Sequence, residues 1–318
     1  MTAPLPDGPI DTLGFLDAVL AMPEQVEQAG MDPVAGLPAI TDIDHVIVSA
    51  GAGLAPLGDL VTTLVSSVAT IPVIAVRGAF PAFVGPRSLV LSVGDVADAS
   101  VDDRSSTAAG ATFVSLPVAH VESLERTGLA GALVSVLRAL EQLGQYAEVE
   151  SSVAAAAAQL RRRRDELTGP DSPARRLARR VGRTLPLVYG PDPLGGAVAA
   201  RWKQQVNLGA KAASFANALP DLGDDELAGW GQHGDMTRQV FSLVELRHDH
   251  EPAGTDGPMA RVADLLDEVV HERHVVAAEG EGVLAQVLDL VFYGDVFSHH
   301  LAQELEIDPG PVAVWSEA

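Results

Sequence analysis

His45-Val46-Ile47-Val48-Ser49, followed directly by Ala50-Gly51-Ala52-Gly53, is the stretch of sequence that decides the fold. Its first half is short and continuously apolar, as expected of a buried strand, and its second half is a glycine-containing turn. Apolar residues at helical spacing then continue as far as Leu64. Further strands of the same kind are predicted at residues 72–76, 88–93 and 111–116. Continuous apolar strands that alternate with helices predict a parallel sheet covered by helices on both faces.

The same pattern begins again in the second half of the chain. Strands are predicted at residues 185–190, 240–246 and 275–278, and helices at 11–27, at 129–160, from 194, at 259–272 and at 283–305. The sequence therefore predicts an α/β protein with two domains, each a parallel β-sheet sandwiched between α-helices. The predicted boundaries are 1–150 for an N-terminal α/β domain, 151–183 for a helical linker and 184–318 for a C-terminal α/β domain.

Composition restricts the class of protein. The formal net charge of −22 argues against a nucleic-acid partner, because such a surface repels phosphates. The arginine clusters at 161–164 and 175–183 could form an RNA-binding patch, but we interpret them as solvated helix faces. No apolar run reaches the roughly 18 residues that span a bilayer, and no secretion signal is evident, so a cytoplasmic protein without membrane contact is expected. The absence of cysteine excludes disulfides, thiolate nucleophiles and zinc sites with cysteine ligands.

Residues 201–230, RWKQQVNLGAKAASFANALPDLGDDELAGW, contain both lysines of the protein and two of its three tryptophans. The apolar residues of this segment, as far as Phe215, fit a helix better than a strand, and Pro220 forces a break. This segment also carries part of a resemblance to a known family. Its other parts are 76–77 (VR), 81–86 (PAFVGP), 172–183 (SPARRLARRVGR), 186–190 (PLVYG), 278–281 (AEGE), 293–295 (YGD) and 308–312 (DPGPV).

In matching order, these segments resemble the bifunctional phosphoglucose/phosphomannose isomerases of the sugar isomerase (SIS) superfamily. The chain also resembles a divergent actinobacterial, TobH-like branch. The resemblance implies two SIS-type domains, a homodimer, and aldose–ketose isomerisation of a hexose 6-phosphate with neither metal nor organic cofactor. That reaction needs a carboxylate to move the proton, a second group for ring opening, a cation for the enediolate, and loop groups that bind the phosphate.

The catalytic positions implied by the resemblance differ from the family pattern. Leu208 stands where the family has its carboxylate base, and a leucine cannot accept a proton. Asp224 stands where the family has a histidine, and no lysine or arginine follows His300 to match the family's lysine near the C-terminus. Arg126 is the retained counterpart of the family's arginine. Because one catalytic group contributes about 10²–10⁴ in rate, we expect the ordinary mechanism to be lost.

Both predicted phosphate loops also differ from the family pattern. The first retains Gly51 and Gly53 without the family's serine. The second retains Ser92 but introduces Asp95 and Asp98, whose charges repel a phosphate. Further substrate-binding candidates are Gly190, Arg201, Asn207 and Lys211. For these candidates a structural role remains an alternative, with Arg201 paired to acidic residues across the domain interface.

Other chemistries are possible on the residues alone. Glu226 could replace the missing base, with His233 nearby in sequence, or the acidic turn 224–226 could simply be solvated. Metal candidates are His248-Asp249-His250, His271 with His274, and His299-His300. The first run is also explained as surface residues, and His271 with His274 as residues at a helix end, where the dipole favours cations. Ser49, Ser92 and His120 lack the context of a hydrolase triad. We therefore predict a cytoplasmic, homodimeric phosphosugar-binding protein with a degenerate catalytic site, a pseudoenzyme, or alternatively a non-catalytic regulatory or structural subunit in sugar-phosphate metabolism.

Overall fold

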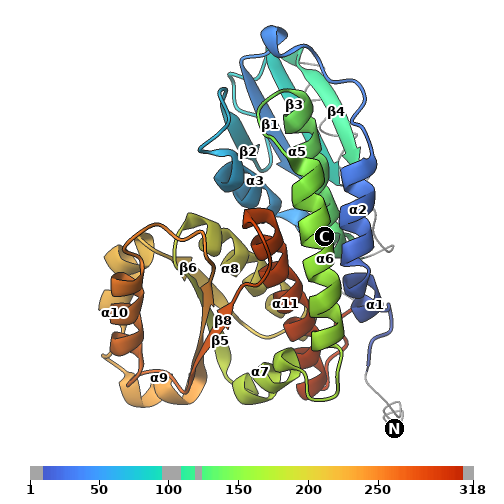
Figure 1. Ribbon diagram of the computed structural model, residues 1–318. Helices are drawn as coiled ribbons and strands as arrows, with labels where there is room; N and C mark the ends of the chain where they lie inside the picture. Colours follow the sequence, from blue (N-terminus) through green and yellow to red (C-terminus); the bar gives the residue numbers. More distant parts are fainter. Residues whose placement is uncertain (1–9, 95–108, 119–123, 311–318) are drawn as a thin grey trace. The chain divides into compact units, whose positions relative to one another are not determined.

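The computed structural model describes residues 10–94, 109–118 and 124–310. These residues form two compact units (Figure 1). The N-terminal unit is Ala21–Ala158, and the C-terminal unit combines the described residues of Met1–Leu20 with those of Gln159–Ala318. The helix α6 (Val149–Leu167) contributes residues to both units. None of the described helices is long and apolar enough to cross a membrane.

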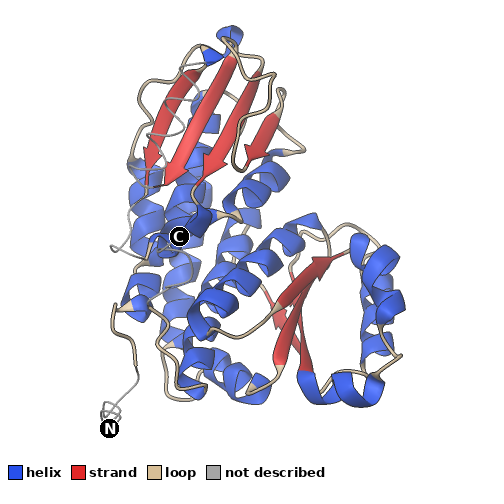
Figure 2. Ribbon diagram, turned by 180° about the vertical axis from the view of Figure 1, so that it is seen from behind, coloured by secondary structure: helices blue, strands red, loops and turns tan. Residues whose placement is uncertain are grey.

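The N-terminal unit contains one four-stranded parallel sheet with the strand order β2-β1-β3-β4 (Figure 2). Its elements before α6 are, in chain order, α2 (Met22–Met31), η1 (Ile40–Asp42), β1 (His45–Ala50), η2 (Ala52–Leu54), α3 (Leu57–Val65), β2 (Val73–Val76), β3 (Ser88–Gly94), β4 (Thr112–Pro117), η3 (Glu125–Gly128) and α5 (Leu129–Gln142).

The two faces of this sheet are buried in different ways. Ile47 lies beside Val90 in the sheet, and both join an apolar cluster with Val76 and Val84. Successive residues of a strand point to opposite faces, so Ala75, the neighbour of Val76, belongs to the other face. The helix α3 packs closely on that other face. A Cβ added at Gly58 would lie only 2.5 Å from the Cβ of Ala75.

The C-terminal unit contains a second four-stranded parallel sheet, in the order β6-β5-β7-β8. Besides α6, its elements are α1 (Phe15–Leu20), α7 (Pro173–Val181), β5 (Leu185–Gly190), α8 (Pro193–Gln205), η4 (Val206–Ala210), β6 (Phe215–Ala218), η5 (Leu222–Glu226), η6 (Leu227–Gly229), α9 (Gly234–Val240), β7 (Phe241–Arg247), α10 (Asp256–Leu266), β8 (Arg273–Ala277) and α11 (Val283–Glu304).

Helices cover both faces of this second sheet as well. On one face, Leu187 and Leu243 form a core cluster with Val262 and Leu266 of α10. On the other face, α8 packs so closely that a Cβ at Gly196 would lie 2.7 Å from the Cβ of Ala218. The predicted α/β class, with two parallel sheets flanked by helices, is therefore confirmed.

The strands predicted around residues 45–49, 72–76, 88–93, 111–116, 185–190, 240–246 and 275–278 are all present. The helix expected as far as Phe215 is wrong, because Lys211 has the left-handed φ of 53° and Phe215 begins the edge strand β6. The helix expected at 11–27 is divided into α1 and α2, with Pro23 in the first turn of α2. The helix expected at 259–272 is α10, which ends at Leu266.

Candidate functional site

The predicted site residues of the N-terminal unit gather at the carboxyl ends of β1 and β3. The amide of Gly51 donates to the carbonyl of Val93 at 3.0 Å, which fixes the turn after β1 to the end of β3. A Cβ at Gly53 would lie 2.8 Å from the Glu125 carboxylate and 3.3 Å from the Arg126 amide. Only glycine therefore allows the turn after β1 to approach η3 this closely. Ser92 lies nearby within β3 and is 1% exposed.

Arg126 brings a buried positive charge to this edge of the sheet. It belongs to η3 and is only 4% exposed. Ligands of open parallel sheets bind outside the carboxyl ends of the strands, where turns and helix N-termini face the crevice. The glycine turn at that edge thus meets the Arg126 backbone amide and the Glu125 carboxylate. Asp95, Asp98 and His120, which the sequence also singled out, lie outside the described residues.

The corresponding edge of the C-terminal sheet is organised differently. A Cβ at Gly190 would lie 2.2 Å from the backbone carbon of Gly195, so the turn after β5 is packed directly on the start of α8. Asp192 caps that helix, its carboxylate accepting from the Gly195 amide at 2.7 Å. The Nε2 atom of His248 lies 3.1 Å from the same carboxylate oxygen. The protein's own carboxylate thus occupies the place where a helix N-terminus would receive an anion.

Arg201 does not lie at either of these edges. Its guanidinium forms a two-point ion pair with Asp295, and both side chains are fully buried. The next residue, Trp202, stacks on Tyr293 and Phe297 and donates to the carbonyl of Leu290. This arrangement favours the structural alternative for Arg201, although its partner belongs to the same unit rather than to the other domain.

The π-helical turn η4 contains Asn207 and Leu208, and Lys211 is the residue that directly follows it. The Asn207 side chain accepts from the Ser214 amide at 2.9 Å. The Lys211 ammonium donates to the carbonyls of Leu208 and Asp308, at 3.0 and 2.9 Å. Both polar side chains therefore stabilise backbone segments at the end of α8, and Leu208 offers no atom that can accept a proton.

Glu226, the candidate replacement base, is already engaged by two donors. The Tyr189 hydroxyl donates to one carboxylate oxygen, and the Asn217 amide donates to the other at 2.8 Å. Burial, followed by the hydrogen bond to Glu226, raises the pKa of Tyr189, so this phenol remains a donor. Asp224 is an exposed residue of η5, and His233 is an exposed residue that precedes α9. Sequence reasoning gave no signal of the Tyr189 contact.

The candidate metal ligands of the described chain do not gather into one site. His248 is buried and contacts Asp192, whereas Asp249 and His250 are exposed. The expectation that residues 248–250 all lie on the surface is therefore wrong for His248. His274 is buried on β8, and burial lowers its pKa to about 4. His299 and His300 are buried on α11. In the described part of the chain, no three histidine or carboxylate side chains are placed to hold a metal ion.

Comparison with known proteins identifies what the chain is similar to. Residues 170–317 match the family described as the bacterial phospho-glucose isomerase C-terminal SIS domain. The bifunctional phosphoglucose/phosphomannose isomerase of Caldicellulosiruptor bescii is 24% identical over 94% of this chain and 96% of its own length. The enzyme of the same name from Aquifex aeolicus is 31% identical over 43% of this chain and 42% of its own length. The predicted resemblance is thereby confirmed.

Solved structures agree on the fold. The C-terminal domain of glucosamine-fructose-6-phosphate aminotransferase from Francisella tularensis has a TM-score of 0.72 at 12% identity, covering 93% of this chain and 98% of that one. Tagatose-6-phosphate ketose/aldose isomerase from Escherichia coli has a TM-score of 0.68 at 13% identity, covering 94% and 96%. The two parallel sheets with their helices therefore share the fold of these structures.

Proposed function

Because this chain is related to the bifunctional phosphoglucose/phosphomannose isomerases, we propose that it binds a hexose 6-phosphate and does not isomerise it. The observation that carries the proposal is the contrast between two groups of residues. The residues that we propose to bind an anion lie together at the carboxyl edge of the N-terminal sheet. The proton-transfer group has a leucine at the position of the base.

The binding half of the proposal rests on Gly51, Gly53, Ser92 and Arg126. The glycine turn lets the backbone approach η3, and Arg126 of η3 carries a buried positive charge. A phosphate is the anion that such a turn at the end of a parallel strand accommodates, since backbone amides and a guanidinium bind its oxygens. The sugar ring would then extend away from the sheet.

The catalytic half rests on Leu208 and Glu226. Aldose–ketose isomerisation requires a carboxylate free to take a proton from carbon. Leu208 cannot do so, and the Glu226 carboxylate is held by Tyr189 and Asn217. For Glu226 to serve, it would have to exchange both hydrogen bonds for contact with the substrate. We therefore assign Arg126 to ligand binding and Glu226 to the structure of the turn.

The second candidate function is a non-catalytic regulatory or structural subunit in sugar-phosphate metabolism. It is favoured by the buried ion pair of Arg201 with Asp295 and by the backbone contacts of Lys211, which give these cations structural roles. In both cases we propose a homodimer that acts in the cytoplasm without metal, as in the family-based expectation.

The test is thermal unfolding of the full chain with glucose, fructose and mannose 6-phosphates, each mixture then being assayed for its isomer. We expect at least one sugar phosphate to raise the unfolding midpoint, because a ligand that binds only the folded state stabilises it. No isomer should accumulate. Arg126→Gln should remove the shift, and Arg126→Lys, which keeps the charge, should retain part of it.

Each other outcome has a definite meaning. Accumulation of an isomer would overturn the loss of catalysis, and its disappearance in Glu226→Gln would identify Glu226 as the base. Absence of any shift would overturn sugar-phosphate binding and leave the structural subunit as the function.

A further inference from the structure

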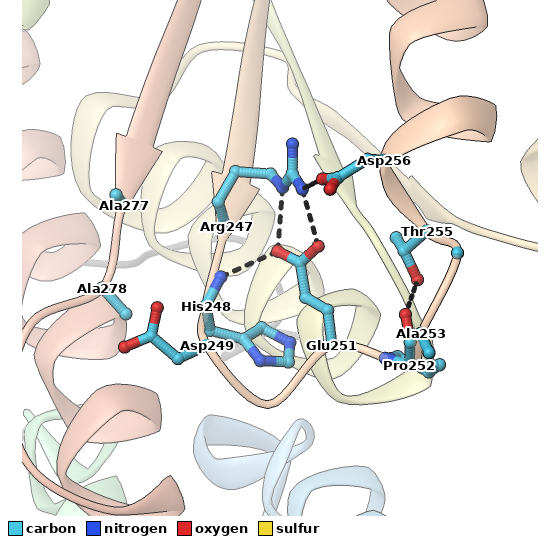
Figure 3. Close-up of a pocket in the computed structure, with 11 residues that line it drawn as sticks. Arg247, His248, Asp249, Glu251, Pro252, Ala253, Thr255, Asp256, Ala277 and Ala278 are labelled. Atoms are coloured by element: carbon cyan, nitrogen blue, oxygen red, sulfur yellow. Dashed lines mark hydrogen bonds and ion pairs between the residues drawn. The ribbon is translucent and has the colours of Figure 1, made fainter.

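A pocket of about 380 Å³ opens at the carboxyl ends of β7 and β8 in the C-terminal unit. Its polar lining comes from Arg247 and His248 at the end of β7, Asp249 and Glu251 in the following loop, and Asp256 at the start of α10. Figure 3 shows Arg247 joined to Glu251 and Asp256, with Ala277 and Ala278 of the β8 end beside Asp249 at the left. The volume is sufficient for a small molecule such as a hexose.

The lining is acidic. Asp249, Glu251 and Asp256 oppose the single positive charge of Arg247. Glu251 holds the Arg247 guanidinium through two hydrogen bonds of 2.8 Å, and Asp256 accepts from the same guanidinium at 2.6 Å. Asp249 is fixed by a reciprocal pair of hydrogen bonds with Gln286. The pocket therefore presents excess negative charge.

Several acceptor atoms of this lining have no donor within the described part of the chain. One oxygen of Asp249 and one of Asp256 receive no hydrogen bond. The buried Nδ1 of His248 also has no partner there, although the side chain is only 3% exposed. The Nε2 of His248 must carry a proton to donate to the Asp192 carboxylate, so in the neutral ring Nδ1 is an acceptor. The buried Nδ1 calls for a donor, and the two carboxylate oxygens, on exposed side chains, can also accept one.

A phosphate does not suit this pocket. Its oxygens are acceptors and would face acceptor atoms of like charge. The nearby N-terminus of α8, the ordinary place for a phosphate in such a fold, is already capped by Asp192. A ligand with a positive charge and several hydrogen-bond donors satisfies both the charge and the unpaired acceptors.

We propose that the pocket at the ends of β7 and β8 is a second ligand site, which binds a small organic ammonium compound that also carries hydroxyl groups. The carboxylates of Asp249 and Asp256 attract the ammonium group, and hydroxyls donate to the remaining acceptors. This site is separate from the phosphate-binding group proposed for the N-terminal unit, and its occupation does not depend on that function.

The test is calorimetric titration of the full chain with glucosamine, and with glucose as the neutral compound of the same shape. We expect saturable binding of one glucosamine per chain, at least about tenfold tighter than glucose, since only the amine meets the carboxylates. Asp249→Asn and Asp256→Asn should each weaken glucosamine binding about fivefold or more. Asp264→Asn, the same change at an exposed position of α10 outside the lining, should leave it unchanged.

Two further measurements make the result decisive. Added salt should weaken glucosamine binding, because screening reduces the attraction between ammonium and carboxylates. The imidazole signals of His248 should move on titration in nuclear magnetic resonance spectra. Equal affinity for glucose and glucosamine, no effect of either pocket variant, or displacement of glucosamine by Ca²⁺ at equal concentration would each overturn the proposal, the last by indicating a cation site instead.

Discussion

Arg201 and Asp295 form a two-point ion pair with nitrogen–oxygen distances of 2.8 and 3.0 Å, and solvent reaches neither side chain. The pair links the middle of α8 to the middle of α11. Removing one partner from a buried pair leaves an uncompensated charge in the core. The stability of the C-terminal unit should therefore depend strongly on both residues.

For Asp295→Asn we expect the free energy of unfolding to fall by about 3–5 kcal/mol, measured by urea denaturation. The control is Asp171→Asn, the same chemical change in an exposed pair with Arg176, for which a loss below about 1 kcal/mol is expected. Should both variants lose the same amount, the pair would not have the structural importance assigned to it. Weaker sugar-phosphate binding by a stable Arg201→Lys would instead support a binding role.

Gly190 is a packing requirement of the turn after β5. In Gly190→Ala, the added Cβ would lie 2.2–2.3 Å from backbone atoms of Gly195 and Gly196, which cannot move without displacing α8. We expect a loss of at least about 3 kcal/mol, or failure to fold, because overpacking against backbone is not relieved by side-chain rotation. Gly223→Ala, where no atom lies within 4 Å, is the control. Yields and unfolding midpoints of the two variants, compared side by side, decide the matter.

Two buried histidines should make the protein sensitive to acid. Burial lowers the pKa of both His274 and His300 to about 4, and neighbouring positive groups act in the same direction. In the unfolded chain each titrates near 6.5, so the unfolded state takes up protons first as the pH falls. The stabilisation is therefore present above pH 6.5 and is lost between pH 6.5 and 4, by up to about 1.4 kcal/mol per pH unit for each residue.

Urea denaturation at about pH 7 and about pH 5 measures this loss. His300→Gln should reduce the difference between the two pH values, whatever its effect at either one. A variant that keeps the full difference would show that His300 does not contribute to it.

The three tyrosines lead us to expect that the protein loses stability at alkaline pH. Burial raises the pKa of all three, Tyr146, Tyr189 and Tyr293, the last to about 12. Because the folded pKa values exceed the unfolded value of 10, their stabilisation is complete below pH 10 and is lost as the pH rises beyond it. Phenolate absorbance should therefore appear together with unfolding, as followed by circular dichroism. Gradual ionisation of even one tyrosine near pH 10, with the fold intact, would contradict this expectation.

The sequence predicted every described strand except the edge strand β6, and it did not predict the side-chain contacts. Continuous apolar runs identified β1 and β5 because a central parallel strand is buried on both faces. The edge strand β6 has only four residues and one large apolar side chain, Phe215, so its pattern could not be told from a helix. The pair Arg201–Asp295 joins positions 94 residues apart, and no local pattern indicates it.

In the candidate site too, the sequence located residues but did not predict their contacts. Family resemblance located Gly51, Gly53 and Arg126, and the structure brings these three together. The hydrogen bond from Tyr189 to Glu226 depends on how η5 folds back over β5, which is a property of the tertiary structure. The buried position of His248 was missed for a related reason, since its neighbours Asp249 and His250 are exposed.

The first helix has a consequence for the order of folding. Thr12 donates to Asp308, and Gln303 donates to the carbonyl of Ile10, so this early segment packs on residues made some three hundred positions later. The N-terminal unit, in contrast, is one continuous segment. During synthesis it can fold as soon as Ala158 has left the ribosome, whereas the other unit must wait with residues 10–20 unpartnered. Loops of that length close slowly, so docking of α1 should be among the last steps of maturation.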